Sequence, residues 1–455
     1  MTRSVAIIGP LNEQLSLFLQ RSDGQEDTCF GVYSPSTGAE RFSAVLQEVL
    51  WPNSGDRNVH GNTSFNPEYL ARALFEASEK GLGIVLMHSH PLGRGWQGMS
   101  EDDINAESGI APSVFGATGL PLLGLTQAGD FTWSGRFWER IGVRQYQRLD
   151  CTNVRAVGER FKISFNQYLC PAPVITPQQI RTVSAWGETK QADIARLRVG
   201  IVGAGSVGGI VAESLARTGV QRITAIDFDH VEDHNLDRLT YASGGDIGKV
   251  KVVCLADYLG SVATSHYFDV LSIPKSLAER EAQAAALDCD VLFSCVDRPW
   301  GRHLLNQISL AHGIPVIDGG IAARTNRSGE LAAADWRSHV VAPSRACMRC
   351  LGQYDLGWVQ AEREGSLDDP RYIAGLPDGH PLKARQNVSA FALACASRLL
   401  LQFISMVVEP LGENCFGAEH YHFVGDYWEP KSSPVCDHDC PLNAVVGRGD
   451  LHEIQ

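Results

Sequence analysis

The segment that most constrains the fold is LRVGIVGAGSVGGIVAESLARTGVQRITAIDFD, residues 197–229. Its apolar run, glycine turn, helical pattern and second apolar run predict a βαβ unit of a parallel sheet. Gly203, Gly205 and Gly208 follow the spacing Gly-x-Gly-x-x-Gly between strand and helix. Such a turn lets backbone N–H groups at a helix N-terminus approach a phosphate. A nucleotide site is therefore expected here, with Asp227 at the end of the second strand placed to bind ribose hydroxyls.

The residues after this unit bear on which nucleotide binds. The glycine turn alone favours an NAD-dependent oxidoreductase, here one that also contains zinc, and this alternative stays open. However, the chain then adds an amide and several charged groups in close succession, at Asp229, Asn235, Arg238 and Lys251. Two cations near the turn suit a triphosphate whose α-phosphate is attacked while pyrophosphate leaves. Asp297, which follows another predicted strand in SCVDRP, is placed to hold Mg²⁺ against the phosphates.

This half of the chain, roughly Arg181 to Pro441, resembles the ThiF/MoeB/HesA family of ubiquitin-activating-enzyme-like adenylyltransferases. The glycine turn, the Asp-Phe-Asp at 227–229 and the spaced polar residues that follow carry the resemblance, together with Asp297 in the position of the family's Thr-Asp-Asn aspartate. The resemblance implies ATP-dependent adenylation of the C-terminal tail of a ubiquitin-like or sulfur-carrier protein. It also implies phosphate contacts from Asn235, Arg238 and Lys251.

The same resemblance implies a homodimer. Arg181 stands six residues before Gly187, as does the family's arginine that reaches into the neighbouring subunit. Arg181 is therefore expected to act in the partner's nucleotide site.

Four cysteines form two close pairs, Cys347 and Cys350 in CMRC, and Cys436 and Cys440 in CDHDC. Close pairs let both thiolates of each pair turn onto one tetrahedral ion, so together they predict a closed structural Zn²⁺ site. The second pair has the longer spacing, which keeps His438 open as a substitute ligand. Many members of the resembled family carry such a zinc.

A nucleophile that would take the modifier as a thioester is not evident. No cysteine lies between Cys350 and Cys395, and Cys395 falls in an apolar helical run typical of a core. Cys415 is in a loop-like segment without a motif. Thioester formation, and with it a conjugating-type enzyme as a further partner, stays an open expectation.

The first part of the chain contains a second metal pattern, in MHSHPLGRGWQGMSEDD (87–103). His88 and His90 end a predicted strand and point to the same side of it. Ser100 and Asp103 begin a helical pattern and suit an N-terminal cap, which also aims the Asp103 carboxylate. Two His and one Asp leave zinc an open position, which is the catalytic arrangement.

This pattern resembles the JAMM/MPN (Mov34/PAD-1-like) family of zinc isopeptidases. The resemblance implies that His88, His90 and Asp103 ligate a catalytic Zn²⁺, that Ser100 helps to hold the oxyanion and that Glu26 is the general base. The loop before Asp103 is two residues longer than usual, so Asp102 remains an alternative ligand. The loose context of the base leaves Asp27 and Glu40 as alternatives to Glu26, and an inactive docking module remains an alternative for the whole domain.

Net charge and the lengths of the apolar runs limit the possible partners and the cellular location. A net charge of −13 over 455 residues argues against a non-specific nucleic-acid binder. The N-terminal apolar run is too short for a signal peptide, and the apolar stretch Leu399–Val408 is too short for a membrane span. We therefore expect a cytoplasmic location without membrane contact, where the 12 cysteines serve as ligands or core residues.

The expected fold is α/β in two domains. Residues 1–160 are expected to form an α+β JAMM/MPN (cytidine-deaminase-like) domain, and 161–195 a linker with the helix that carries Arg181. Residues 196–455 are expected to form a Rossmann-like, doubly wound ThiF-type domain with the structural zinc. The combined expectation is an adenylyltransferase joined to a zinc (iso)peptidase that processes the same modifier.

Overall fold

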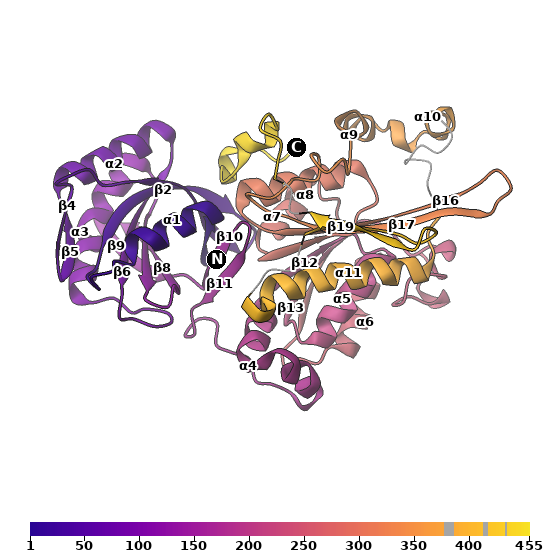
Figure 1. Cartoon of the computed structure of the whole chain (residues 1–455), viewed down its shortest axis with the longest axis horizontal. Coiled ribbons are helices and arrows are strands. Elements are labelled where there is room, and N and C mark those ends of the chain that lie inside the picture. Colours follow the sequence, from indigo (N-terminus) through magenta and orange to yellow (C-terminus); the bar gives the residue numbers. More distant parts are fainter. Residues whose placement is uncertain (377–385, 413–416, 433–434) are drawn as a thin grey trace. The chain divides into compact units, whose positions relative to one another are not determined.

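A computed structural model describes residues 1–376, 386–412, 417–432 and 435–455 (Figure 1). Within these residues the chain divides into two compact units. The first contains Met1–Pro171, Ala311–Gly313 and Ala444–Glu453. The second contains Ala172–Leu310, Ile314–Asn443 and Ile454–Gln455. The α/β class expected from the sequence is confirmed, and both units are built on large mixed sheets.

The first unit is a mixed sheet in the order β11-β10-β1-β3-β2-β6-β7-β8-β9. Its strands are β1 (Thr2–Ile8), β2 (Thr28–Thr37), β3 (Arg41–Leu50), β6 (Gly83–His90), β7 (Leu122–Ala128), β8 (Trp133–Gly142), β9 (Gln145–Asp150), β10 (Asn153–Val157) and β11 (Phe161–Phe165). A separate hairpin pairs β4 (Arg57–His60) with β5 (Asn62–Phe65). Strand β11 belongs to this unit and begins where the sequence places the linker.

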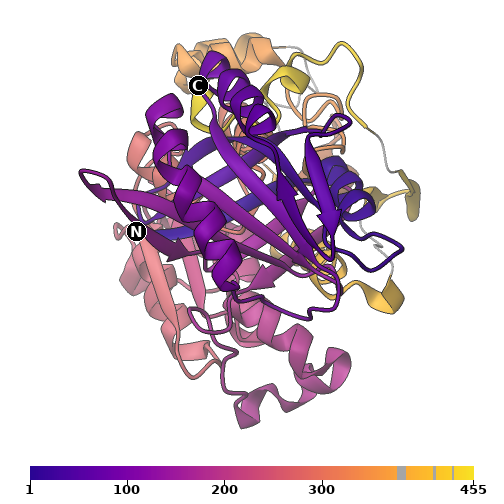
Figure 2. The same cartoon turned by 90° about the vertical axis from the view of Figure 1, so that its left-hand side faces the viewer.

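Helices cover both faces of this sheet, because its central strands are apolar on both sides. Leu15 and Leu19 of α1 (Gly9–Leu19) pack into one core cluster. The other cluster holds apolar residues of α2 (Pro67–Lys80) and α3 (Glu101–Thr118). In Figure 2, which faces this unit, helices cross in front of the strands.

A segment from the far end of the chain also packs in the first unit. The backbone N–H of Thr37 donates to Asp450 Oδ1 at 3.0 Å, and its hydroxyl donates to Asp450 Oδ2 at 2.6 Å. Gly449 has φ +48°, and a Cβ there would lie 2.1 Å from the Pro35 carbonyl oxygen. The segment 444–453 is thus fastened to the end of β2, and only glycine fits at this contact.

The second unit has an eight-stranded sheet in the order β14-β13-β12-β15-β16-β17-β18-β19. Its strands are β12 (Arg198–Val202), β13 (Arg222–Ile226), β14 (Asp269–Ile273), β15 (Val291–Ser294), β16 (Val316–Thr325), β17 (Leu331–Val341), β18 (Ala418–His422) and β19 (Tyr427–Ser432). The first five in the sheet order are parallel and the last three antiparallel. The parallel part is Rossmann-like and doubly wound, as expected.

Helices lie on both faces of this sheet. The α-helices of this unit are α4 (Ile180–Arg196), α5 (Ser206–Thr218), α6 (Lys251–Val262), α7 (Arg280–Leu287), α8 (Pro299–His312), α9 (Leu356–Arg363), α10 (Pro370–Gly375) and α11 (Ser389–Val408), and not all of them contact the sheet. Figure 1 shows α5, α6 and α11 on one face, with α7 and α8 on the other. Residues of α7 and α8 pack with the strands in one buried cluster.

Helix α11 is longer than the apolar stretch that the sequence singles out. It runs for 20 residues with a mean hydropathy of 1.9, which by length and composition alone would suffice to cross a membrane. Half of it is buried, however, and it packs against α5, β16 and β17. Its apolar character is explained by this position on the sheet.

The second unit also buries charge. Asp318 of β16 is fully buried and accepts a hydrogen bond from the Ser294 hydroxyl at 2.6 Å. Arg302 lies 3.3 Å and Arg337 3.6 Å from its carboxylate oxygens, so two cations already balance it. His339 Nδ1 lies 3.7 Å away, and among the described residues its Nε2 has no hydrogen-bond partner. This arrangement fits a neutral imidazole.

We expect His339→Gln to weaken the dependence of stability on acid. Burial lowers the pKa of His339 to about 4 despite the attraction of Asp318, and Arg337 lowers it further. The imidazole pKa in an unfolded chain is about 6.5, so the unfolded state binds more protons between these values. The free energy of unfolding should therefore fall as pH drops through this window, by at most about 1.4 kcal/mol per pH unit. Urea unfolding of both proteins measures the difference; a difference that is independent of pH would contradict the neutral assignment.

Candidate nucleotide and metal sites

The glycine turn joins β12 to α5 through unusually close backbone contacts. Gly203 has φ +96°, and a Cβ there would lie 2.5 Å from the Cys295 carbonyl oxygen. A Cβ on Gly208 would lie 1.9 Å from the Gly203 carbonyl oxygen. Around Gly205, the N-cap of α5, a Cβ would meet nothing within 4 Å. Space therefore remains at the helix N-terminus for a phosphate to reach the backbone N–H groups.

Asp227 lies beside this turn, at the end of β13. Its carboxylate accepts hydrogen bonds from the backbone N–H of Ala204 at 2.6 Å and of Asp229 at 2.8 Å. Burial raises the pKa of Asp227, although both hydrogen bonds oppose the rise. The carboxylate thus ties the turn to the next loop.

The predicted phosphate residues lie on the segment after Asp227. Lys251 begins α6, is buried, and its Nζ lies 2.8 Å from Asp229 Oδ2. Asn235 is also buried, and its Oδ1 accepts from the Glu232 backbone N–H at 3.1 Å. Arg238 donates to the His234 carbonyl at 2.5 Å and to Asp237 at 2.7 Å. The structure therefore brings Lys251 and Asp229 to Asp227, while Asn235 and Arg238 make contacts within their own turn.

Tyr241 returns this segment to the glycine turn. Its hydroxyl donates to the Ala204 carbonyl, and a Cβ on Gly209 would lie 2.8 Å from its ring. The segment after Asp227 is therefore attached to the glycine turn through Tyr241. Tyr241 could not be identified from the sequence alone, because its role depends on these contacts with the turn and α5.

Asp297 follows β15, which flanks β12 on the side opposite to β13. Strand β15 pairs with β12 in parallel up to Val202 and Ser294. The Cys295 carbonyl then contacts Gly203, so Asp297 leaves the sheet at the edge where the turn lies. Its side chain is exposed, which suits a carboxylate that meets a soluble ligand.

Asn387 is a residue of this site that sequence reasoning missed. Its amide donates to the Ser206 hydroxyl in the first turn of α5 at 2.9 Å. Its Oδ1 is buried and has no hydrogen-bond partner among the described residues. No motif surrounds Asn387, and 181 residues separate it from Ser206, so no local pattern could have identified it.

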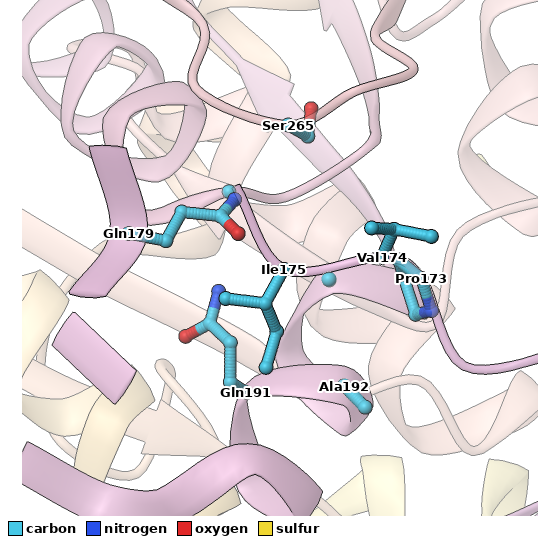
Figure 3. Close-up of a pocket in the computed structure, with 9 residues that line it drawn as sticks. Pro173, Val174, Ile175, Gln179, Gln191, Ala192 and Ser265 are labelled. Carbon is cyan, nitrogen blue, oxygen red and sulfur yellow. The ribbon is translucent and has the colours of Figure 1, made fainter. Parts of the chain in front are cut away.

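Arg181 is exposed in the first turn of α4, and the helix is kinked at Gly187, where φ is +84°. A small recess lies beside this helix, lined by Pro173–Ile175, Gln179 and Gln191 (Figure 3). Its volume of about 10 Å³ admits one water molecule and excludes a nucleotide. This recess is therefore not the nucleotide site.

The four predicted zinc cysteines meet in one cluster. Their sulfur atoms all lie within 4.8 Å of one another, and Cys347 Sγ is 3.8 Å from Cys440 Sγ. Thiolates on a tetrahedral zinc, with Zn–S of about 2.3 Å, stand about 3.8 Å apart. The pKa of Cys347 is lowered, because Cys436 and the Cys350 backbone N–H donate to its sulfur. The donor set therefore fits zinc, whereas the predicted alternative His438 has a fully exposed side chain.

The described cysteines offer no exposed nucleophile. Cys395 is buried in α11 against the Gly320 carbonyl, and burial raises its pKa to about 12. Every other described cysteine is buried or partly buried. Cys415 lies outside the described residues.

The first unit brings His88, His90 and Asp103 together. The two Nε2 atoms are 3.2 Å apart, and Asp103 Oδ1 and Oδ2 lie 3.4 Å from His88 and 3.5 Å from His90. Imidazole and carboxylate ligands of tetrahedral zinc, at about 2.0–2.1 Å, stand about 3.3 Å apart. Gln97 Oε1 lies 3.4 Å from His90 Nδ1, the orienting contact typical of a metal-bound histidine. The three residues therefore fit a zinc ion.

The predicted general base lies beside this group. Thr28 of β2 pairs with His88, so Glu26, two residues earlier, lies at the same end of the sheet. Burial raises the pKa of Glu26, against the attraction of His90, and Asp103 adds to the rise. Asp27 is buried in ion pairs with Arg21 and Arg57.

Glu40 and Asp102 do not take part in this group. Glu40 follows the opposite end of β2 and is exposed. Asp103, not Asp102, reaches the histidines. Ser100 caps α3 as predicted, with its hydroxyl accepting from Asp103 N–H at 3.1 Å and Asp103 Oδ2 accepting from Ser100 N–H at 2.9 Å. Ser100 is thus occupied in the cap, and no contact that it makes marks an oxyanion position.

A buried ion pair lies next to His88 and is connected to it through the Thr126 hydroxyl. Glu107 of α3 pairs with Arg136 of β8, and the Trp138 indole N–H donates to Glu107 at 2.7 Å. Arg136 donates to the Thr126 hydroxyl at 2.5 Å, which lies 3.3 Å from His88 Nε2. Burial lowers the pKa of His88 to about 3, and Arg136 lowers it further. His88 is therefore neutral at pH 7, the state that a metal ligand requires.

The second unit is similar to a known family and to curated proteins. The ThiF family model matches residues 177–407. The adenylyltransferase and sulfurtransferase UBA4 of Yarrowia lipolytica is 28% identical over 37% of this chain and 40% of that protein. The molybdopterin-synthase adenylyltransferase of Escherichia coli is 28% identical over 34% of this chain and 59% of that protein. The chain thus matches 40% and 59% of the length of these curated relatives.

Among solved structures, a crystal structure of E. coli MccB with ATP is 15% identical, with a TM-score of 0.45, over 59% of this chain and 74% of that chain.

We expect Glu107→Gln to destabilise the first unit by about 3 kcal/mol or more. The change leaves the Arg136 guanidinium buried without a counter-charge, which costs about 3–5 kcal/mol when one partner of a buried pair is removed. Both side chains are at most 3% exposed, so water cannot compensate. Urea unfolding measures the loss. Glu101→Gln, on the exposed start of the same helix, is the matched control and should change stability by less than about 1 kcal/mol; equal effects of the two changes would refute the pair's importance.

Proposed function

This chain belongs to the ThiF family, and on that premise we propose that it uses ATP to adenylate the C-terminal carboxylate of a ubiquitin-like or sulfur-carrier protein. The observation that carries the proposal is the group of charged side chains at the glycine turn. Lys251 and Asp229 lie next to Asp227, and Asp297 leaves the sheet on the other side of the turn. The names of the curated relatives support it, since both are adenylyltransferases.

In this proposal each residue has a defined task. The N-terminus of α5 receives a phosphate, and Asp227 binds the ribose. One carboxylate oxygen of the carrier protein attacks the α-phosphorus while the bond from phosphorus to the bridging oxygen breaks and pyrophosphate leaves. Arg238 and Lys251 stabilise the negative charge that develops on the leaving group. Asp297 would hold Mg²⁺, which neutralises phosphate charge.

Two further features follow from the same proposal. Arg181 is exposed, as a residue that acts in the site of a homodimer partner must be. The four cysteines would hold a structural zinc that fixes the segment around Cys436 and Cys440 to the loop around Cys347. A conjugating-type enzyme is a further partner only if a cysteine accepts the modifier. We place the reaction in the cytoplasm.

For the first unit we propose a zinc-dependent (iso)peptidase of the JAMM/MPN type. His88, His90 and Asp103 would hold the ion, which supplies a Lewis acid for the scissile carbonyl. Glu26, with its raised pKa, would take a proton from the attacking water. The peptidase would release the carrier's C-terminus, which is the carboxylate that the second unit activates.

A docking role and an oxidoreductase role make different predictions. An inactive docking module would retain the metal residues without hydrolysis. A zinc-containing NAD-dependent oxidoreductase would use the glycine turn but leave Lys251, Arg238 and Asp297 without a task.

The adenylation proposal predicts ATP–pyrophosphate exchange that depends on a carrier protein. With the full chain and candidate ubiquitin-like or sulfur-carrier proteins, we expect Arg238→Ala and Asp297→Asn each to reduce exchange about 100-fold or more, because each removes charge stabilisation of the transition state. Incorporation of labelled pyrophosphate into ATP measures the rate.

Matched controls come from the amino ends of strands of the same sheet. Arg222 begins β13 and Asp269 begins β14, and both are exposed. Arg222→Ala and Asp269→Asn should leave exchange within about twofold of wild type. No exchange with any candidate carrier, together with tight NAD binding, would establish the oxidoreductase instead.

The peptidase proposal predicts that Glu26→Gln reduces cleavage of a carrier protein with a C-terminal extension by about 100-fold or more, since the general base is lost. Cleavage is followed by mass spectrometry, and zinc content is measured on the same samples. Glu40→Gln, at the opposite end of β2, is the control and should cleave at the wild-type rate. A Glu26→Gln protein that holds zinc and cleaves as fast as wild type would leave docking as the role of this unit.

A further inference from the structure

The last three strands of the second sheet gather a group of polar side chains outside the sites described above. His420 and His422 are two residues apart on β18 and therefore point to the same face. Asp335 of β17 stands directly opposite His422, and Glu429 of β19 directly opposite His420. Directly paired residues share a face, so all four side chains lie on one side of the sheet.

The distances within this group suit shared coordination. His422 Nδ1 lies 2.9 Å from Asp335 Oδ1, and His422 Nε2 lies 3.2 Å from Glu429 Oε1. His420 Nδ1 lies 3.7 Å from Glu429 Oε2. One ligand atom from each of Asp335, His420 and His422 fits within 4.8 Å. Asp335 and Glu429 face opposite nitrogens of His422, so only Asp335 shares a possible ion with both histidines.

The opposite face of the same strands makes a firm support. Trp336 packs on Tyr421 with ring centroids 4.7 Å apart, and Tyr421 packs on Trp428 at 4.6 Å. Phe391 of α11 stacks on Trp336 at 6.0 Å. Because side chains alternate along a strand, this aromatic packing fixes the backbone from which the polar group projects.

The charges in the group favour a cation. Two carboxylates face two imidazoles, and the nearest fixed cation is engaged elsewhere: Arg337 pairs with His420 across the strands, but its guanidinium lies 3.6 Å from Asp318. The side chains of Asp335 and His422 are 15% and 20% exposed, so the group is shielded but reachable from solvent. Imidazole nitrogen and carboxylate oxygen together are ligands that first-row transition metals accept.

We propose that Asp335, His420 and His422 form a binding site for a divalent transition-metal ion of the zinc class. One nitrogen of each imidazole and one oxygen of Asp335 bind the ion, while Glu429 contacts the histidine rings and orients them. The ligands come from β17 and β18, so the ion fastens these two strands to each other. The site is independent of the proposed adenylation and peptidase activities.

The test is equilibrium dialysis of the full-length protein against Zn²⁺, with bound metal counted by elemental analysis. We expect His420→Ala/His422→Ala to bind one equivalent less than wild type. His266→Ala, an exposed histidine in the loop before β14, should bind as much as wild type. Retention of every equivalent by the double variant would overturn the proposal.

A second pair of variants guards against misfolding. His420→Gln/Glu429→Gln preserves side-chain size at the two most exposed positions and should also lose one equivalent. Co²⁺ in place of Zn²⁺ separates the sites, because only the four cysteines give a thiolate charge-transfer band. That band should be unchanged while total bound cobalt falls by one equivalent. Loss of the band instead, with the other cobalt retained, would assign the missing ion to the cysteines and refute the proposal.

Discussion

The second unit depends on a place where three backbone segments come closer than side chains would permit. Gly203 lies against the Cys295 carbonyl, and Gly208 lies against the Gly203 carbonyl. These contacts bring the end of β12, the end of β15 and the start of α5 to one point. Asp227 and Asp297 then leave their strands on either side of the same helix N-terminus. A methyl group at Gly203 or Gly208 would separate the very elements that position the charged residues.

The first unit positions its residues by a different means. The pairing of Thr28 with His88 sets Glu26 beside the two histidines, and the cap at Ser100 aims Asp103 at them. Behind them a buried ion pair fills the space between α3 and the sheet. A Cβ on Gly124 would lie 2.4 Å from the Glu107 carboxylate, so the sheet itself is shaped around that charge. The register of β2 and β6, the cap at Ser100 and the buried ion pair together position the polar side chains of this site.

Features that depend on near neighbours in sequence could be predicted. The glycine spacing around Gly203 indicated the strand, turn and helix, and the Ser100–Asp103 cap formed as expected. The two cysteine pairs were also predicted to come together at one metal site, because each pair is a local motif.

Features that depend on register or on distant packing could not be predicted. The contact of Asn387 with Ser206 joins residues 181 positions apart. Asp335 and His420 meet only because β17 and β18 pair in one register, and no spacing in the sequence encodes this pairing. The extent of α11 also does not follow from the apolar stretch Leu399–Val408, because the helix begins at Ser389 and buries polar residues such as Gln402.

The packing of segment 444–453 on β2 has a consequence for how the chain matures. The first unit includes Met1–Pro171, yet it acquires its last segment only after residues up to Asn443, nearly all of the second unit, have been synthesised. A ribosome that has released the first 171 residues has therefore not yet supplied everything that this unit contains. An N-terminal fragment that ends at the linker would lack the segment 444–453 that packs on β2. To study the first unit alone, this segment would have to be added as a separate peptide or fused to the fragment.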